Sequence, residues 1–260
     1  MMASVLSWCL VSHVDWLRYC IDPAKQLPDS VAPVCPEKQL RFFSLRVGPS
    51  RRLVASAQHV DGLILVWDSR TRRLLSEIRQ KSPVSCVAFH CAPGSNLLAT
   101  VSADERQTLS IWKWKDAKLV AQSSDSNLKT FDCQFHPNWP NTLVSCGLKH
   151  LTFWSLFGNT LTKTNGVSSN AQLSPTILCV AFAADGGTLG GALNGRIYLW
   201  RRQELVGEIE SQHHGGVFCL CPTDQGYLST GRDGLIQRWD DEFQLLGSID
   251  VAANKRVGYA

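Results

Sequence analysis

The stretch YLSTGRDGLIQRWDD, residues 227–241, contains two short apolar runs joined by Arg-Asp-Gly. Asp-Gly is typical of two-residue hairpin turns, because both residues tolerate positive φ angles. The run YLSTG and the run that ends at Trp239 therefore predict two antiparallel strands. VFCLC at 217–221 and LLGSI at 245–249 flank them and predict two more. We expect four consecutive short strands, with the tryptophan in the third.

The same arrangement occurs five times along the chain. The third strand of each unit contains one of five tryptophans, spaced 45, 42, 46 and 39 residues apart: Trp67, Trp112, Trp154, Trp200 and Trp239. A period of about 40–45 residues with four short strands per unit is typical of WD40 β-propeller repeats. Helical periodicity does not extend beyond about ten residues anywhere. The sequence predicts an all-β fold, a WD40 β-propeller with about five recognisable blades.

The repeats also set the expected domain boundaries. Residues 1–40 form a non-repeat N-terminal segment, and residues 41–260 form the WD40 repeat propeller. The expected blades lie near 41–80, 84–125, 131–165, 177–210 and 217–250. Five blades are fewer than the roughly seven of an ordinary closed ring, so we expect a partial or incomplete ring. An open array of this kind leaves sheet edges exposed.

Composition narrows the class of protein. The chain of 260 residues is 44% apolar, enough to bury a sizeable core, and only 18% charged. Its net charge of +4 is too small to indicate a dedicated nucleic-acid binder. Four of the ten cysteines occur within apolar runs, where a thiol packs as a small hydrophobe. We therefore expect a reducing compartment without disulfides, and no membrane-spanning segment.

Unit five is most similar to the WD40 pattern, in which a histidine, a serine, an aspartate and the tryptophan form a buried hydrogen-bonded tetrad. This similarity implies a structural tetrad of His213, Ser229, Asp233 and Trp239. Buried indole and carboxylate groups need such partners. Unit four has Asn194 at the aspartate position and unit three has Lys149 and His150 in its turn, so we expect incomplete tetrads there.

Metal binding and catalysis are the two chemical alternatives to core packing for the polar and cysteine residues. His213, His214, Cys219 and Cys221 include good zinc ligands, but the usual Cys-x-x-Cys spacing is missing. The sequence also contains no Gly-x-Ser-x-Gly elbow, no His-Glu-x-x-His and no phosphate-binding glycine loop. We predict no metal site, no cofactor, no catalytic residues and no enzymatic activity.

Several longer stretches resemble the echinoderm microtubule-associated protein-like (EML) family. They are LSIWKWKDAKLVA (109–121), FDCQFHPNWPNTLVSCGLKHLTFW (131–154), ILCVAFAADGGTLGGALNGRIYLW (177–200) and HHGGVFCLC (213–221). The resemblance covers residues from about 50 to about 250. It implies fused β-propellers that associate with microtubules, so tubulin is the implied partner and the microtubule cytoskeleton of the cytoplasm the implied location. The chain departs from the family in lacking a heptad pattern and a basic arm at its start.

Two features are candidates for partner binding. The segment 41–81 has nine basic and three acidic residues, and Arg70, Arg72 and Arg73 lie within it. A basic face favours docking on an acidic polymer such as a microtubule. The alternative is that these basic residues are ordinary solvated loop residues without a binding role. Trp139, between two prolines, could anchor a partner or pack over the neighbouring blade.

These observations favour a non-catalytic WD40 scaffold that binds tubulin and cytoskeletal partners. The alternative is a general WD40 adaptor that binds other proteins through the propeller rim and has no affinity for microtubules. Neither hypothesis includes a nucleic acid or a membrane as a partner.

Overall fold

A computed structural model describes residues 42–48, 52–58, 61–124, 128–167, 175–211 and 213–251. Within these ranges the regular structure consists of twenty β-strands and no helix. Accordingly, the described residues include no helix long and apolar enough to cross a membrane. The predicted N-terminal segment, 1–40, lies outside the described residues, as do Arg41 and Arg51 of the basic segment.

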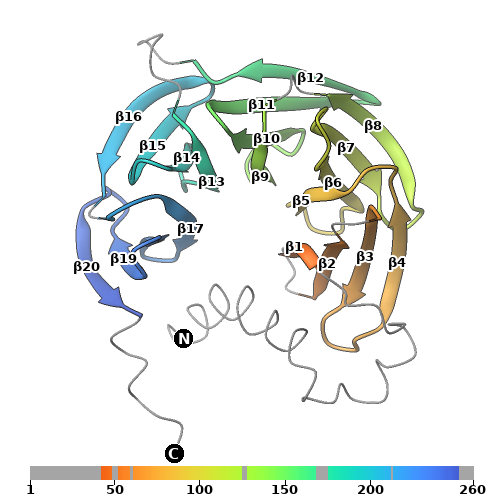
Figure 1. Cartoon of the computed structure of the whole chain (residues 1–260), viewed down its shortest axis with the longest axis horizontal. Helices are drawn as coiled ribbons and strands as arrows, with labels where there is room; N and C mark the ends of the chain where they lie inside the picture. The colour runs from red at the N-terminus through yellow and green to blue at the C-terminus, as the bar shows by residue number, and fades with distance from the viewer. Residues whose placement is uncertain are drawn as a thin grey trace, which may run out of the picture. The chain divides into compact units, whose positions relative to one another are not determined.

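The strands form five four-stranded sheets, and each sheet takes its strands in chain order (Figure 1). The bounds are β1 (Phe42–Val47), β2 (Leu53–Gln58), β3 (Leu63–Asp68) and β4 (Leu74–Arg79) in the first sheet; β5 (Val84–Phe89), β6 (Leu97–Ser102), β7 (Thr108–Lys113) and β8 (Lys118–Ser124) in the second; β9 (Thr130–Phe135), β10 (Thr142–Gly147), β11 (His150–Phe157) and β12 (Thr160–Asn165) in the third; β13 (Ile177–Phe182), β14 (Thr188–Ala192), β15 (Arg196–Arg201) and β16 (Glu204–Glu210) in the fourth; and β17 (Val217–Thr223), β18 (Gly226–Gly231), β19 (Leu235–Trp239) and β20 (Leu245–Asp250) in the fifth. The prediction of an all-β protein with five recognisable blades is confirmed.

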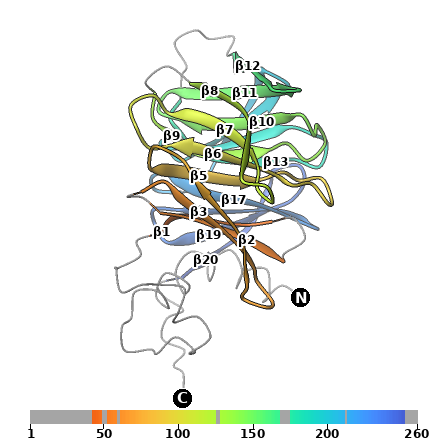
Figure 2. The same cartoon turned by 90° about the vertical axis from the view of Figure 1, so that its right-hand side faces the viewer.

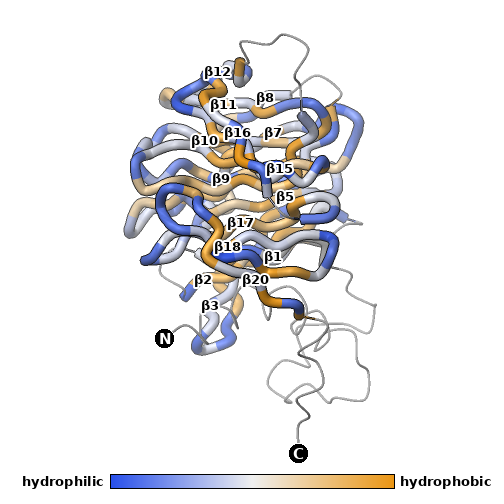
Figure 3. The backbone as a smooth tube through the Cα atoms, turned by 90° about the vertical axis from the view of Figure 1, so that its left-hand side faces the viewer, coloured by the Kyte–Doolittle hydropathy of each residue, from blue (hydrophilic) through white to orange (hydrophobic). Residues whose placement is uncertain are grey.

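Burial differs between the first and last strands of a blade. Five of the six residues of β13 are buried, whereas exposure alternates along the whole of β16. A strand covered on both faces is apolar throughout, and a strand with one solvated face alternates. β13 and β16 are the two edge strands of their sheet (Figure 1). The hydropathy view agrees, since polar stretches gather at turns while apolar colours follow the strands (Figure 3).

The chain divides into two compact units, which are described separately. The first unit holds β1 to β6, most of β7 and the start of β8. Its core joins the first two sheets: Ile64 and Val66 of β3 pack with Val84 of β5, Leu98 of β6 and Trp112 of β7. All five side chains are buried, so each of these two sheets depends on the other for the burial of one face.

The second unit holds β9 to β20, and two apolar clusters join its three sheets. In one cluster Phe153 of β11 packs with Ile177 and Trp200 of the fourth sheet. In the other, Leu189 of the fourth sheet packs with Trp239 of the fifth. In both clusters the repeat tryptophan faces the preceding sheet. Figure 2 shows the four strands of the second sheet, β5 to β8, running side by side.

The turn between the second and third strands has one left-handed residue in every blade. This residue is Gly62, Gln107, Lys149, Gly195 and Gly234 in turn, with φ angles between 45° and 84°. Glycine is needed at 195, because a Cβ there would lie 2.9 Å from the carbonyl oxygens of both His213 and Gly215. The residues at 107 and 149 adopt the same backbone conformation with a side chain.

Each blade also has an irregular step at the start of its first strand. The pairing of β17 with β18 passes from Val217 directly to Cys219 and leaves Phe218 out of register. The same step leaves out Ser85 in β5, Phe131 in β9 and Leu178 in β13, and a matching step occurs in β1. Such β-bulges bend a strand and turn one side chain away from its ladder.

Candidate functional site

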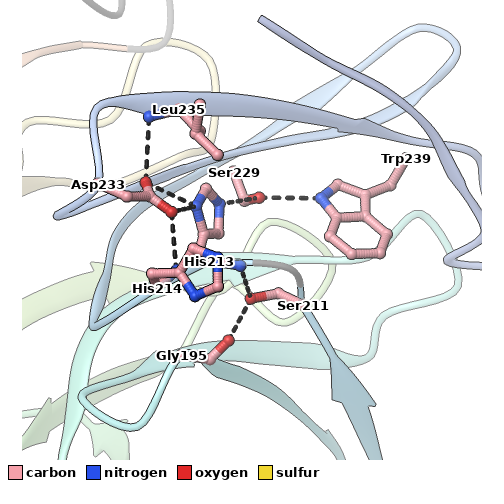
Figure 4. Close-up of polar contacts among 8 residues, drawn as sticks. All are labelled: Gly195, Ser211, His213, His214, Ser229, Asp233, Leu235 and Trp239. Atoms are coloured by element: carbon pink, nitrogen blue, oxygen red, sulfur yellow. Dashed lines mark hydrogen bonds and ion pairs between the residues drawn. The ribbon is translucent and has the colours of Figure 1, made fainter. Parts of the chain in front are cut away.

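The four residues of the expected tetrad form one hydrogen-bonded chain in the fifth blade (Figure 4). The Trp239 indole N–H donates to the Ser229 hydroxyl over 2.9 Å, and that hydroxyl lies 2.8 Å from His213 Nε2. His213 Nδ1 lies 3.1 Å from Asp233 Oδ1. In the neutral imidazole, Nδ1–H donates to the carboxylate, which can only accept, so Nε2 accepts from Ser229.

Asp233 connects this chain to the adjoining turn. Its carboxylate accepts the backbone N–H of Leu235 over 3.0 Å and that of His214 over 2.8 Å, in addition to the His213 contact. Desolvation raises the pKa of Asp233, but the two backbone N–H groups and the imidazole outweigh it and leave the pKa below its ordinary value. The carboxylate therefore holds the strand entry at 213–214 against the turn at 233–235.

The second blade contains a related chain that the sequence pattern did not indicate. The Trp112 indole N–H donates to Thr100 Oγ1 over 3.0 Å, and Thr100 donates to Gln80 Oε1 over 2.9 Å. Gln80 precedes Val84 by four residues, as His213 precedes Val217. Glutamine thus takes the place of histidine, and this equal offset before the first strand was the available signal.

The remaining blades have shorter hydrogen-bonded chains or none at the tryptophan. Trp154 donates to Ser145 over 2.8 Å in the third blade, and Trp67 donates to Ser56 over 3.1 Å in the first. In the fourth blade Gly190 replaces the hydroxyl residue, and a Cβ there would lie 2.8 Å from the Trp200 ring. The ring therefore packs over backbone where the other blades place a hydroxyl. At the aspartate position of this blade, the Asn194 side-chain amide donates to the Tyr198 hydroxyl.

The three candidate arginines lie on the turn between β3 and β4, and all three are exposed. Asp68 shapes this turn: its carboxylate accepts the backbone N–H groups of Arg70 and Thr71 and the side chain of Arg52. The N–H of Thr71, followed by the Arg52 guanidinium, lowers the pKa of Asp68 well below its ordinary value. The Asp68 carboxylate thus faces Arg52 and the backbone, and Arg70 and Arg73 are exposed on the turn.

Trp139 lies in the loop between β9 and β10 and stacks on His136, with ring centroids 4.0 Å apart and an interplanar angle of 14°. His136 Nδ1 accepts the N–H of Asn138, and Nε2 lies 3.1 Å from the carbonyl oxygen of Gly186 in the next blade. Burial lowers the pKa of His136, although the hydrogen bond to Gly186 opposes this shift. Trp139 is 36% exposed, so its ring both packs over this contact and presents one side to solvent.

Among the four candidate zinc ligands, His213 has protein partners for its whole ring. Both ring nitrogens of His213 face Asp233 and Ser229, as described above. Across the described ranges, no three His, Cys, Asp or Glu side chains gather as a metal would require.

The comparison with known families fits this geometry. The family model for the echinoderm microtubule-associated protein first beta-propeller matches residues 41–258. The chain belongs to the EML family. This EML chain is 33% identical to echinoderm microtubule-associated protein-like 2 of Mus musculus over 195 residues. It is 31% identical to echinoderm microtubule-associated protein-like 1 of Homo sapiens over 223 residues.

The EML chain corresponds to part of these relatives. The two alignments cover 72% and 80% of this chain but 30% and 27% of the relatives' own length. Among solved structures, the Cps50 (Swd1) β-propeller domain of Myceliophteria thermophila is similar, with a TM-score of 0.69 and 15% identity. That match covers 84% of this chain and 74% of the other, and it confirms the β-propeller fold.

Proposed function

We propose that this chain is a non-catalytic scaffold that binds tubulin in microtubules. The observation that carries the proposal is the exposed basic turn between β3 and β4, in a chain whose family is named for microtubule association. The turn presents Arg70, Arg72 and Arg73, and within the described part of the chain none of them forms an ion pair. Cationic side chains that are free of acidic partners attract an acidic surface.

Two acidic residues of the segment 41–81 pair with arginines outside the turn, which supports the same proposal. Asp68 faces Arg52 over 2.7 Å, and Glu77 faces Arg79 over 2.7 Å. Two of the three acids are thus matched to other arginines. These two acids therefore do not neutralise the three positive charges of the turn, which a large partner could reach.

Cosedimentation with stabilised microtubules tests this proposal. The variant Arg70→Glu/Arg73→Glu reverses two charges and leaves Arg72 unchanged, because its left-handed backbone (φ 57°) makes a substitution there ambiguous. We expect the Kd to rise about tenfold, since two exposed ionic contacts contribute roughly 0.2–1 kcal/mol each and their reversal adds repulsion. The control, Lys118→Glu/Lys163→Glu, makes the same charge change on two exposed outer-strand positions and should leave the Kd within about twofold.

Ionic strength gives a second readout. Binding through the basic turn should weaken between about 50 and 200 mM salt, because the Debye length falls across this range. Pelleting that is unchanged by salt and by the double variant would exclude the turn as the docking surface. A complete lack of pelleting at low salt would exclude microtubules as the partner.

The second candidate is a protein-binding adaptor without microtubule affinity. The exposed side of Trp139 and a group of exposed apolar residues at one end of the sheets in the second unit favour it. Recovery of a stoichiometric partner other than tubulin, together with a negative cosedimentation result, would support this candidate. The corresponding proposals for location are the microtubule cytoskeleton for the first function and the cytoplasm for both.

A further inference from the structure

The second unit carries large apolar side chains at the end of its sheets where first strands begin and second strands turn into third strands. Phe218, left out of register by the bulge in β17, is 52% exposed, and Leu193, in the turn after β14, is 55% exposed. Phe131 and Leu178 occupy the matching bulges of β9 and β13 and are half-buried. Bulges turn these side chains away from their ladders, so the exposure follows from the backbone.

Contacts across the fourth and fifth blades bring Leu178 and Leu193 together beside the start of β17. A Cβ built on Gly216, two residues before Phe218, would lie 2.7 Å from Leu178 Cδ1 and 3.5 Å from Leu193 Cδ1. Leu178, Leu193 and the start of β17 therefore form one apolar surface. β13 and β17 lie next to each other, consistent with this placement (Figure 1).

The third blade extends the surface through β9. The Val180 N–H in β13 donates to Asp132 in β9 over 3.2 Å, and Gln134 donates to the Val180 carbonyl oxygen over 2.7 Å. These bonds hold β9 beside β13 and bring Phe131, next to Asp132, to the same end. The Lys129 ammonium lies 5.9 Å from the centre of the Phe131 ring. An aromatic surface is thus bordered by a cation.

Exposed basic residues border this apolar surface. Lys129 is exposed beside Phe131, and Arg232 lies in the turn after β18, where its Cβ is 3.4 Å from a Cβ built on Gly215. The acids of the same strands and turns face inward: Asp132 is buried against Val180, and Asp233 accepts from His213, His214 and Leu235. A partner that reaches Phe131 and Phe218 would therefore meet Lys129 and Arg232, while the exposed Glu210 at the same end of β16 lies 3.1 Å from Arg196.

We propose that this surface binds an extended acidic peptide segment of a partner protein, which places an apolar side chain between Leu178, Leu193 and Phe218. We call it the rim, and it consists of Phe131, Leu178, Leu193 and Phe218 with Lys129 and Arg232. Charge complementarity selects the acidic segment, and the half-exposed Phe218 ring and the aliphatic groups of Leu178 and Leu193 offer apolar contact area for the anchor. The rim lies in the second unit and the basic turn in the first, so this proposal does not depend on microtubule binding.

Selection of random dodecapeptides on the immobilised chain tests the proposal. We expect the enriched peptides to contain at least two carboxylates around one Phe, Leu or Ile. A labelled peptide from this set, measured by fluorescence anisotropy, should bind at least tenfold more weakly to Phe218→Asp and about threefold more weakly to Lys129→Glu. The control Val206→Asp places the same charge at a residue of similar exposure (51%) on β16 and should leave the Kd unchanged.

Specific outcomes would overturn the proposal. The first is a set of enriched peptides without carboxylates. The second is an enrichment on the parent chain that is no greater than the enrichment on Phe218→Asp. The third is an equal rise in the Kd of the labelled peptide for Phe218→Asp and Val206→Asp. A twenty-nucleotide oligothymidine that binds as tightly as the peptide, and is weakened by the same two changes, would assign the rim to nucleic acid. Circular dichroism and melting temperatures of the variants distinguish lost binding from lost folding, and Lys129→Glu provides a test that leaves the apolar groups in place.

Discussion

Replacement of Ser229 by alanine gives a quantitative test of the buried chain in the fifth blade. The Ser229 side chain is fully buried, and its hydroxyl is the shared partner of Trp239 Nε1 and His213 Nε2. Alanine leaves two buried polar atoms unpaired, and each costs about 1–3 kcal/mol. His213 keeps Asp233 on its other nitrogen, so we expect a loss of about 2–4 kcal/mol in the free energy of unfolding. This is a large share of the roughly 5–15 kcal/mol typical of a native domain.

Urea titration followed by far-ultraviolet circular dichroism measures the loss. With a slope of about 2–3 kcal/mol per molar, the midpoint should fall by about 1 M at unchanged slope. Thr230→Ala changes the neighbouring residue on the other face of β18 and should cost less than half as much. In a double-mutant cycle with Trp239→Phe, the two losses should be non-additive by at least about 1 kcal/mol. A Ser229→Ala loss below about 0.5 kcal/mol, or strict additivity, would refute the reasoning.

Three further predictions concern other blades and pH. Thr100→Val should lower the unfolding free energy by about 1–3 kcal/mol, because it removes the hydroxyl that joins the buried Trp112 indole to the half-buried Gln80 amide, whereas Thr100→Ser should lower it much less; urea midpoints compare the two. Gly190→Ala should cost about 1–3 kcal/mol, because its Cβ would meet the Trp200 ring at 2.8 Å, whereas Gly247→Ala, with open space around it, should change the melting temperature little. Because the pKa of Asp233 is lowered in the folded chain, its contribution is present above pH 4 and is lost as pH falls below that. Asp233→Asn should therefore be less stable than the parent at pH 7, and the gap between their urea midpoints should close towards pH 3.

Much of the fold follows from local sequence signals. Asp-Gly and Asn-Gly mark the turns that end at Gly234 and Gly195, since these positions require positive φ. Gln107 and Lys149 adopt the same backbone conformation without such a dipeptide. At position 107 a reason is visible, because the Gln107 side chain accepts the N–H of Thr130 and a glycine would lose that bond. Turn propensities describe local sequence only, so they do not predict a conformation that depends on a tertiary contact of this kind.

The residues of the candidate site were likewise predicted from the sequence only in part. The spacing in the fifth blade was sufficient to group His213 with Ser229 and Trp239, because it follows a common pattern. Gln80 was missed, since an amide replaces an imidazole and only its position before the first strand marks it. The two interpretations of Trp139 could not be separated by sequence, because they depend on whether His136 of the same loop lies beneath the ring.

The bulge at the start of each first strand has a consequence for how such proteins diversify. The residue it leaves out is a serine at 85, a leucine at 178 and a phenylalanine at 218, while the preceding residues Val84 and Val217 remain fully buried. Chemistry at this position can change without moving the register of the ladder or the packing beside it. The residue that stabilises the blade and the residue that can contact a partner are thus adjacent in the chain. One substitution at the bulge could change which partner binds while the rest of the blade keeps its fold.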